Sequence, residues 1–151
     1  MISFRKIEEK DGPFIQKLYR STRERELDQT NWPEDQKHMF IVMQLIAQLA
    51  DYEKKFKDAS YQLILYKKEP AGRLYLWESE REIRIIDMSL LPAFQGKGIG
   101  KDILSNIIQE AKQKNKIASL YVTVDHPAKK MYERIGFKKV SGTLTHEYME
   151  A

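Results

Sequence analysis

The feature that most constrains this chain is a strand-like run that passes through three closely spaced glycines into a helix-like run. The strand-like run is Glu82 to Leu90, the glycines are Gly96, Gly98 and Gly100, and the amphipathic run is Lys101 to Lys114. The first amides of a helix have no partner within the helix, and the helix dipole favours an anion beside them. Glycine lets the backbone approach a ligand closely. The stretch therefore predicts a cradle for a diphosphate group.

Length and composition predict one folded domain spanning residues 1–151, with 42% hydrophobic and 32% charged residues. No apolar run approaches the roughly 18 residues of a membrane span. The N-terminal residues enter a strand-like pattern directly and lack the apolar core of a signal peptide. We therefore expect a cytoplasmic protein without a membrane partner.

The side-chain inventory argues against several kinds of site. There are no cysteines, which excludes disulfides, thiolate metal sites and a cysteine nucleophile. The three histidines, His38, His126 and His146, are scattered without metal-ligand spacing, so we expect no metal. The net charge of +4 suits an anionic ligand. Basic and acidic residues are interspersed rather than gathered in a stripe, so we expect no nucleic-acid partner.

Hydrophobic periodicity predicts an alternating series of elements. The order is β-α-α-β-β-β-α-β-α-β-β, which indicates an α+β domain with a mixed, mainly antiparallel sheet flanked by helices. Strict alternation along the strand 82–90 would place Ile85 and Asp87 on one face and Met88 on the other. In the second helix, Met39 and Met43 are expected to fill the core.

Two nucleotide-binding patterns fail at specific residues. A Walker loop needs Ser or Thr after its lysine. Here Lys97 precedes Gly98, and Lys101 precedes Asp102. The dinucleotide fingerprint needs a third glycine where this chain has Lys101 or, in the other register, Ile103.

What remains resembles the GCN5-related N-acetyltransferase (GNAT) family. The family's acetyl-CoA loop reads Arg or Gln, two variable residues, Gly, one variable residue, then Gly or Ala, and this chain has Gln95-x-x-Gly98-x-Gly100. Leu90-Leu91-Pro92 is similar to the end of the family's fourth strand. Ala128-x-x-Met131-Tyr132-Glu133-x-Ile135-Gly136-Phe137 is similar to its second motif. The three motifs stand in the family's order and at its spacing.

The resemblance implies a GNAT-like acyl-CoA N-acyltransferase fold and acetyl-CoA as co-substrate. It implies that backbone groups at Met88 and Leu90 bind the pantetheine arm like an added strand, and that the Leu90 amide polarises the thioester carbonyl. The amides that would hold the pyrophosphate are those of Gln95, Gly96, Lys97, Gly98, Ile99 and Gly100.

The second motif supplies further expected contacts. Ala128 and Tyr132 would touch the cofactor, and Tyr132 is the residue that the family uses as general acid. A phenol can give a proton to a departing thiolate. The family commonly has an Asn before this motif, where this chain has Asp125 and His126. Either side chain is a candidate for the pantetheine contact that the Asn makes.

Two carboxylates are candidates for the general base. Asp87 is our first candidate because it lies three residues before Leu90, and Glu78 is the second. The alternative interpretation of Asp87 is a carboxylate paired with Arg73 or Arg84.

These features predict an N-acetyltransferase that moves an acetyl group directly to a primary amine in a ternary complex. The amine is a small molecule or a peptide that the sequence does not specify. The alternative is a non-catalytic acyl-CoA-binding sensor or regulatory domain. A homodimer through the last two strands is a further expectation.

Overall fold

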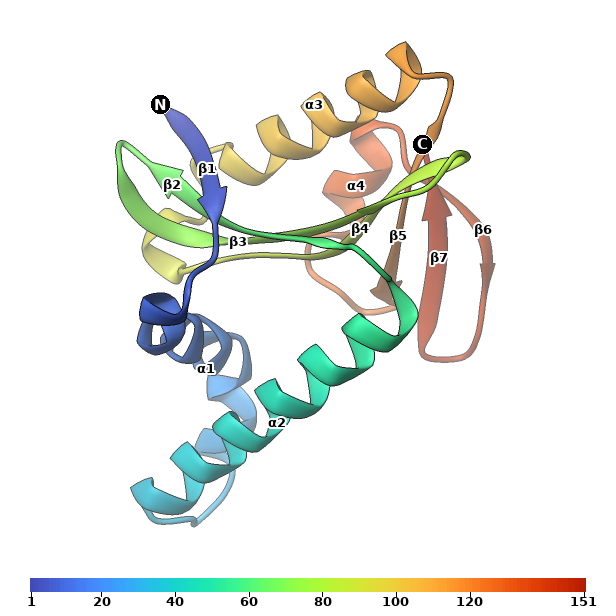
Figure 1. Ribbon diagram of the computed structural model, residues 1–151. Coiled ribbons are helices and arrows are strands. Elements are labelled where there is room, and N and C mark those ends of the chain that lie inside the picture. The colour runs from blue at the N-terminus through green and yellow to red at the C-terminus, as the bar shows by residue number, and fades with distance from the viewer.

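The computed structural model describes residues 1–151 and contains one seven-stranded sheet with four α-helices (Figure 1). The strands are β1 (Ile2–Lys6), β2 (Ser60–Tyr66), β3 (Glu69–Glu78), β4 (Glu82–Leu90), β5 (Ile117–Thr123), β6 (Lys138–Gly142) and β7 (His146–Glu150). The helices are α1 (Gly12–Asp28), α2 (Glu34–Lys55), α3 (Ile99–Gln113) and α4 (Lys129–Ile135), with short 3-10 turns at Glu9–Asp11 and Pro92–Phe94. The predicted order of elements and the predicted fold class are confirmed.

The sheet has the strand order β1-β2-β3-β4-β5-β7-β6. All neighbours are antiparallel except β4 and β5, which the α3 crossover joins in parallel. In Figure 1, α3 and α4 lie on one face of the sheet and the hairpin of α1 and α2 lies on the other. None of the helices has the length and apolar character that crossing a bilayer requires.

The main core lies between the sheet and the α3 side. It holds 17 buried residues, including the α3 stripe Ile103, Leu104, Ile107 and Ile108. A separate cluster of three buried residues, Tyr19, Leu27 and Ile41, joins α1 to α2. The α1–α2 hairpin thus has its own small core, and its contacts with the sheet include the Arg73–Gln48 hydrogen bond and the Tyr52–Tyr75 ring pair.

A β-bulge in β4 overturns the strict alternation expected there. Tyr75 pairs with Asp87 and Leu76 with Ile85, so Ile86 has no partner on β3. A bulge adds one residue and reverses the alternation beyond it. Ile85 and Met88 therefore both pack on the α3-side core, whereas Asp87 points toward α2.

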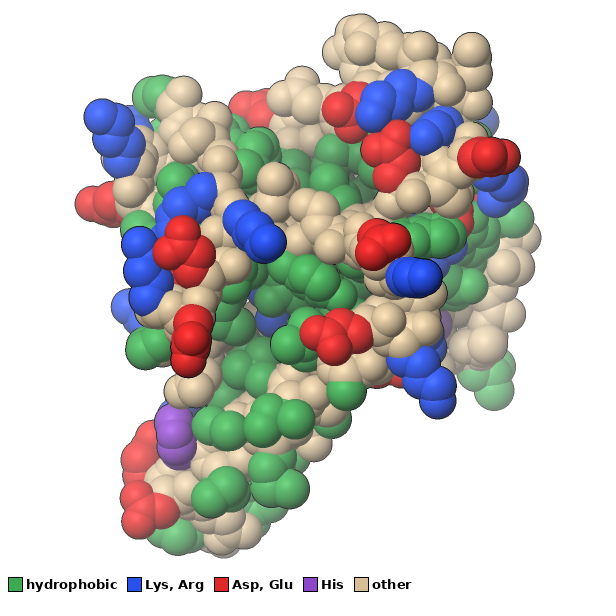
Figure 2. Space-filling view, in the orientation of Figure 1, with side chains coloured by type: hydrophobic (Ala, Val, Ile, Leu, Met, Phe, Trp, Pro, Cys, Tyr) green, Lys and Arg blue, Asp and Glu red, His purple; other side chains and the backbone are tan.

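The outer face of α2 also differs from expectation. Met39 and Met43 were predicted to lie in the core, but they are 58% and 60% exposed. The helix packs on α1 and the sheet through its opposite face, which carries Ile41, Gln48 and Tyr52. Figure 2 shows hydrophobic side chains uncovered along α2.

Two turns and one helix start complete the fold. The turn before β3 is Lys67-Lys68, both with positive φ, and the strand begins at Glu69. The turn between β6 and β7 lies at residues 143–145. Asp11 precedes α1, but its carboxylate accepts from Arg5 and from the Glu8 amide rather than capping the helix.

Candidate active site

The edge of β4 opens where β5 turns away from it. The β4–β5 ladder spans only Glu82 to Ile85, while β3 stays paired with β4 as far as Leu90. The Leu91 amide donates to Ala71 on β3. In an antiparallel ladder such bonds recur at every second residue, so the backbone groups of Met88 and Leu90 point to the open side. This edge can take an added extended chain.

The glycine loop lies directly beyond this edge. Gly96 and Gly98 have φ of 75° and 81°, a conformation that residues with a Cβ adopt at a cost. Gly98 is the N-cap residue of α3, and the amides of residues 96–98 make no backbone hydrogen bond. A Cβ on Gly100 would lie 3.3 Å from the Met88 methyl carbon Cε. The geometry leaves free donors at the N-terminus of a 15-residue helix beside the open strand edge.

Gln95 and Lys97 have other partners within the loop. The Gln95 amide donates to Pro92, and its side-chain Nε2 donates to the Leu90 carbonyl at 2.9 Å. Gln95 therefore braces the loop against the end of β4. The Lys97 ammonium lies 5.9 Å from the ring centres of both Tyr66 and Phe94. Ile99 is buried in the core and contributes only its backbone to the cradle.

Tyr132 faces a cavity of about 540 Å³ that also reaches Asp87 and Met88. The residue is 9% exposed, on the short helix α4. Its ring packs edge-on against Phe137 and lies parallel to the His126 ring at 5.9 Å. Burial raises the pKa of the Tyr132 phenol, and the charge of Asp87 adds to the effect. The group is thus a protonated donor at neutral pH.

His126, rather than Asp125, lines this cavity. The His126 Nδ1 accepts from the Ala128 amide at 3.0 Å, which leaves Nε2 as its other polar atom. Burial lowers the pKa of the imidazole, while Asp125 acts in the opposite direction. Ala128 is the N-cap residue of α4, and Asp125 is exposed at the surface.

Asp87 lines the same cavity, but one of its oxygens is occupied. Its Oδ2 accepts from Arg73 at 2.5 Å and from the Tyr52 hydroxyl at 3.5 Å. Its Oδ1 has no hydrogen-bond partner in the protein. The ion-pair interpretation of Asp87 is thus present in the structure, and it leaves the second carboxylate oxygen without a partner. The role as general base stays a prediction. The partner is Arg73, not Arg84, which pairs with Glu82.

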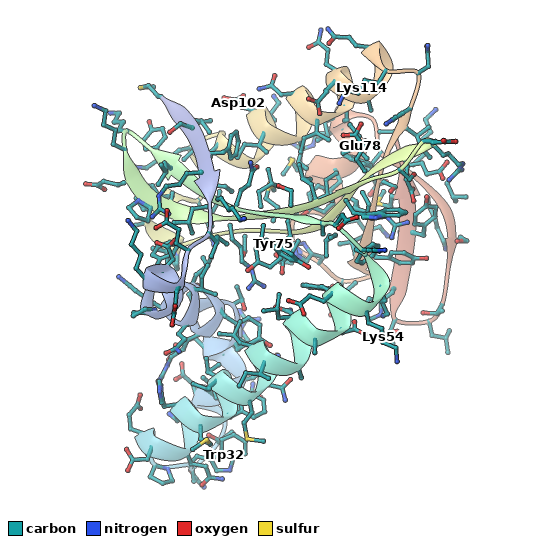
Figure 3. All side chains as sticks on the ribbon, in the orientation of Figure 1. Trp32, Lys54, Tyr75, Glu78, Asp102 and Lys114 are labelled. Carbon is teal, nitrogen blue, oxygen red and sulfur yellow. The ribbon has the colours of Figure 1, made fainter.

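Arg73 organises the α2 side of the site, and sequence reasoning missed this role. It is 3% exposed, donates to Gln48 at 2.8 Å and lies over the Tyr75 ring at 4.7 Å. Figure 3 labels Tyr75 on the face of the sheet that looks toward α2. The one sequence signal that could have indicated this role is a charged residue inside an otherwise apolar strand, in Gly72-Arg73-Leu74 of β3.

Two further residues lie away from this cavity. Glu78, the second candidate base, pairs with Lys116 at 2.6 Å and with Lys114 at 3.1 Å (Figure 3). Trp32 lies near the end of the α1–α2 hairpin, packed on Phe40. Neither lines the cavity that holds Tyr132.

Sequence comparison identifies a family. The sequence profile described as "Acetyltransferase (GNAT) family" matches residues 14–137. A search of curated proteins finds no match to this sequence.

Solved structures with the same fold cover nearly the whole chain. The PaiA N-acetyltransferase from Thermoplasma acidophilum, solved with coenzyme A, has a TM-score of 0.69 at 19% identity, over 99% of this chain and 98% of that one. Spermidine N-acetyltransferase from Vibrio cholerae, solved with CoA and spermine, has a TM-score of 0.64 at 18% identity, over 99% of this chain and 94% of that one. Arabidopsis thaliana Naa50, solved with the bisubstrate analogue CoA-Ac-MVNAL, has a TM-score of 0.63 at 14% identity, over 99% of this chain and 97% of that one.

Proposed function

The chain belongs to the GNAT acetyltransferase family, and we propose that it is an acetyl-CoA-dependent N-acetyltransferase acting on a primary amine. One observation carries the proposal. The free amides before α3 lie beside the open edge of β4, and Met88 of that edge lines the same cavity as Tyr132. An extended pantetheine arm, a pyrophosphate and a leaving thiolate need these groups in this order.

The residues fit acetyl-CoA as co-substrate. Backbone groups at Met88 and Leu90 would take the pantetheine arm, and the amides from Gly96 to Gly100 would take the pyrophosphate. Acetyl-CoA supplies an activated thioester when bound. The Leu90 amide would polarise its carbonyl, since this N–H points to the open edge. His126 lies where a contact to the pantetheine arm is expected, and Ala128 brings Tyr132 into place.

The chain's own groups can move the two protons that the reaction requires. Acyl transfer forms a C–N bond to the amine and breaks the C–S bond of the thioester. The ammonium form of the acceptor must lose a proton first, and the free Oδ1 of Asp87 would accept it directly or through water. Tyr132 would give its proton to the departing thiolate. The attacking nitrogen carries a surplus proton once the C–N bond has formed, and it would pass this proton to the Tyr132 phenolate directly or through water. Direct transfer in a ternary complex needs no covalent intermediate on the protein.

Cofactor binding is tested by the melting temperature. At 100 times its Kd, a ligand that binds only the folded state adds about 2.7 kcal/mol of stability. We expect acetyl-CoA to raise the melting temperature accordingly. Gly98→Val, which forces a branched side chain into positive φ, should lose the increase. An unchanged melting temperature of the wild type at saturating acetyl-CoA would refute the proposal.

The role of Tyr132 is tested by thiol release. Tyr132→Phe should keep the acetyl-CoA shift and lower turnover by about 10²-fold, because general acid catalysis commonly contributes that much. Tyr61→Phe is the matched control, as this tyrosine lines a different cavity and lies outside the one that holds Tyr132. An acceptor panel of polyamines, amino acids, aminoglycosides and peptides serves the assay. Acetyl-CoA binding with no acetylation of any amine would favour the non-catalytic sensor instead.

A further inference from the structure

The cavity at Tyr132 continues into a second cavity along the α2 side of the sheet. The second cavity measures about 650 Å³ and reaches Phe56 and Arg84. The two share Ile85, Ile86, Tyr121 and His146, so they form one groove. The groove starts at Asp87 and Tyr132 and ends at Arg84. Its length allows an acceptor to extend well beyond the reacting amine.

The carboxylates that line this groove are already paired with cations. Asp87 pairs with Arg73, and Asp51 pairs with Lys55 at 3.1 Å. The remaining charged linings are basic or titratable, namely Arg23, Arg84, His126 and His146. A molecule with several ammonium groups would find no unpaired carboxylate here. The groove therefore disfavours a polyamine and favours an acceptor that carries one amine.

Arg84 offers a fixed, unused hydrogen-bond donor at the far end of the groove. Its Nε donates to Ser119 at 2.7 Å and its Nη2 to Glu82 at 3.3 Å. The guanidinium lies over the rings of Phe56, Tyr121 and Tyr148 at 5.0–5.7 Å. Its Nη1 has no partner in the protein and is not among the fully buried unpaired atoms. Such a held guanidinium suits an oxygen ligand, above all a carboxylate.

The spacing of the two ends suits a tripeptide. The bulge at Ile86 places Arg84 and Asp87 on the same face of β4. Asp87 contacts Tyr52 of α2, and Arg84 lies over Phe56, the residue directly after α2. At about 3.3 Å per strand residue their separation is about 10 Å. An extended peptide covers about the same distance from its amino nitrogen to the carboxyl group of its third residue.

We propose that the acceptor is a short peptide with a free N-terminus. Its α-amine lies at Asp87 and Tyr132, and the carboxylate of its third residue binds Arg84. This inference rests on the proposed acetyl transfer and specifies its substrate class. It makes Arg84 a substrate-binding residue.

The test compares peptide acids with their C-terminal amides. For tri-alanine, the wild type should prefer the acid by about tenfold or more in kcat/KM, mainly through KM, as expected for a charge-assisted hydrogen bond. The preference should be smaller for the di- and tetra-alanine pairs. Arg84→Gln should abolish the acid preference while leaving the acetyl-CoA shift intact. A preference ratio does not change merely because a variant is less stable.

Arg81→Gln is the matched control. Arg81 also approaches Glu82, at 3.9 Å, but it is 68% exposed in its side chain and lies outside the groove. It should keep the full acid preference. Equal rates for acid and amide in the wild type, an unchanged preference in Arg84→Gln, or better turnover of spermidine than of tri-alanine would each overturn the inference.

A simple alkylamine separates this inference from the proposed function. It is too short to reach Arg84, so its acetylation depends only on the reacting end of the groove. Turnover of the alkylamine without any peptide preference contradicts the tripeptide inference and leaves the acetyltransferase intact. Loss of acetyl-CoA binding and of alkylamine turnover contradicts the proposed function itself.

Discussion

Asp87 has a structural role in an ion pair and a proposed chemical role as general base. Its Oδ2 accepts from Arg73, which is 3% exposed, and its Oδ1 has no hydrogen-bond partner in the protein. Asp87→Asn would leave Arg73 buried without a counter-ion, so we expect a loss of about 3 to 5 kcal/mol in unfolding free energy. Turnover should also fall, because an amide cannot accept the proton. Chemical denaturation and thiol release measure the two effects.

Tyr52→Phe is the matched control for Asp87. It removes only the 3.5 Å contact to the same oxygen, so its effect on stability should be below about 1 kcal/mol. Equal losses in the two variants would contradict the buried ion pair. An Asp87→Asn protein with full turnover would remove Asp87 from the proposed mechanism.

At the residue scale, sequence motifs predicted the loop and missed the network across the sheet. Gly98 and Gly100 stand in a contiguous pattern, and local backbone geometry explains them. The choice of Arg73 over Arg84 as the partner of Asp87 depends on register across β3 and β4, which no local pattern encodes. The roles of the individual site residues stay predictions until variants test them.

At the element scale, α2 shows what periodicity can and cannot predict. The spacing predicted a helix correctly, because apolar residues recur at three and four positions. The spacing alone could not show which face of α2 packs against α1 and the sheet, since α2 carries apolar residues on both faces. Ile41 is 1% exposed, whereas Met43, two positions later, is 60% exposed. The same ambiguity produced the wrong placement of Met39.

This difference between the two faces of α2 is measurable. Met43→Gln should change the unfolding free energy by less than about 0.5 kcal/mol, as exposed substitutions usually do. Ile41→Ala should cost about 2 to 5 kcal/mol, because it empties a buried site in the α1–α2 cluster. Urea denaturation of both variants gives the comparison. A large loss for Met43→Gln would mean that the outer face of α2 is covered in solution.

At the scale of the whole molecule, the order of the elements followed from the sequence, but the strand order in space did not. β7 enters between β5 and β6, and β1 lies at the opposite edge. Such pairings depend on contacts between distant segments, which periodicity cannot report. The predicted homodimer through β6 and β7 stays a prediction.

The edge strand β1 is joined to the α1–α2 hairpin by one ion pair that should make global stability depend on pH. Arg5 donates two hydrogen bonds, at 2.7 and 2.8 Å, to Asp11, whose Oδ2 also accepts from the Glu8 amide. These bonds to Arg5 and to the Glu8 amide lower the pKa of Asp11 to about 2, from 3.8. Protonation is therefore easier in the unfolded chain, so the stabilisation is complete above about pH 4 and is lost as the pH falls toward 2.

Asp11→Asn isolates this contribution. At pH 7 the variant should be less stable than the wild type by about 2 kcal/mol, the range for a hydrogen-bonded charged group. The difference should shrink between pH 4 and pH 2, because the wild type then loses the same charge. Asp51→Asn is the control, since the Asp51–Lys55 pair is 51% and 62% exposed and should contribute at most about 0.5 kcal/mol at either pH. A difference between Asp11→Asn and the wild type that stays constant from pH 7 to pH 2 would show that the Asp11 charge does not stabilise the fold, and that its loss acts through packing alone.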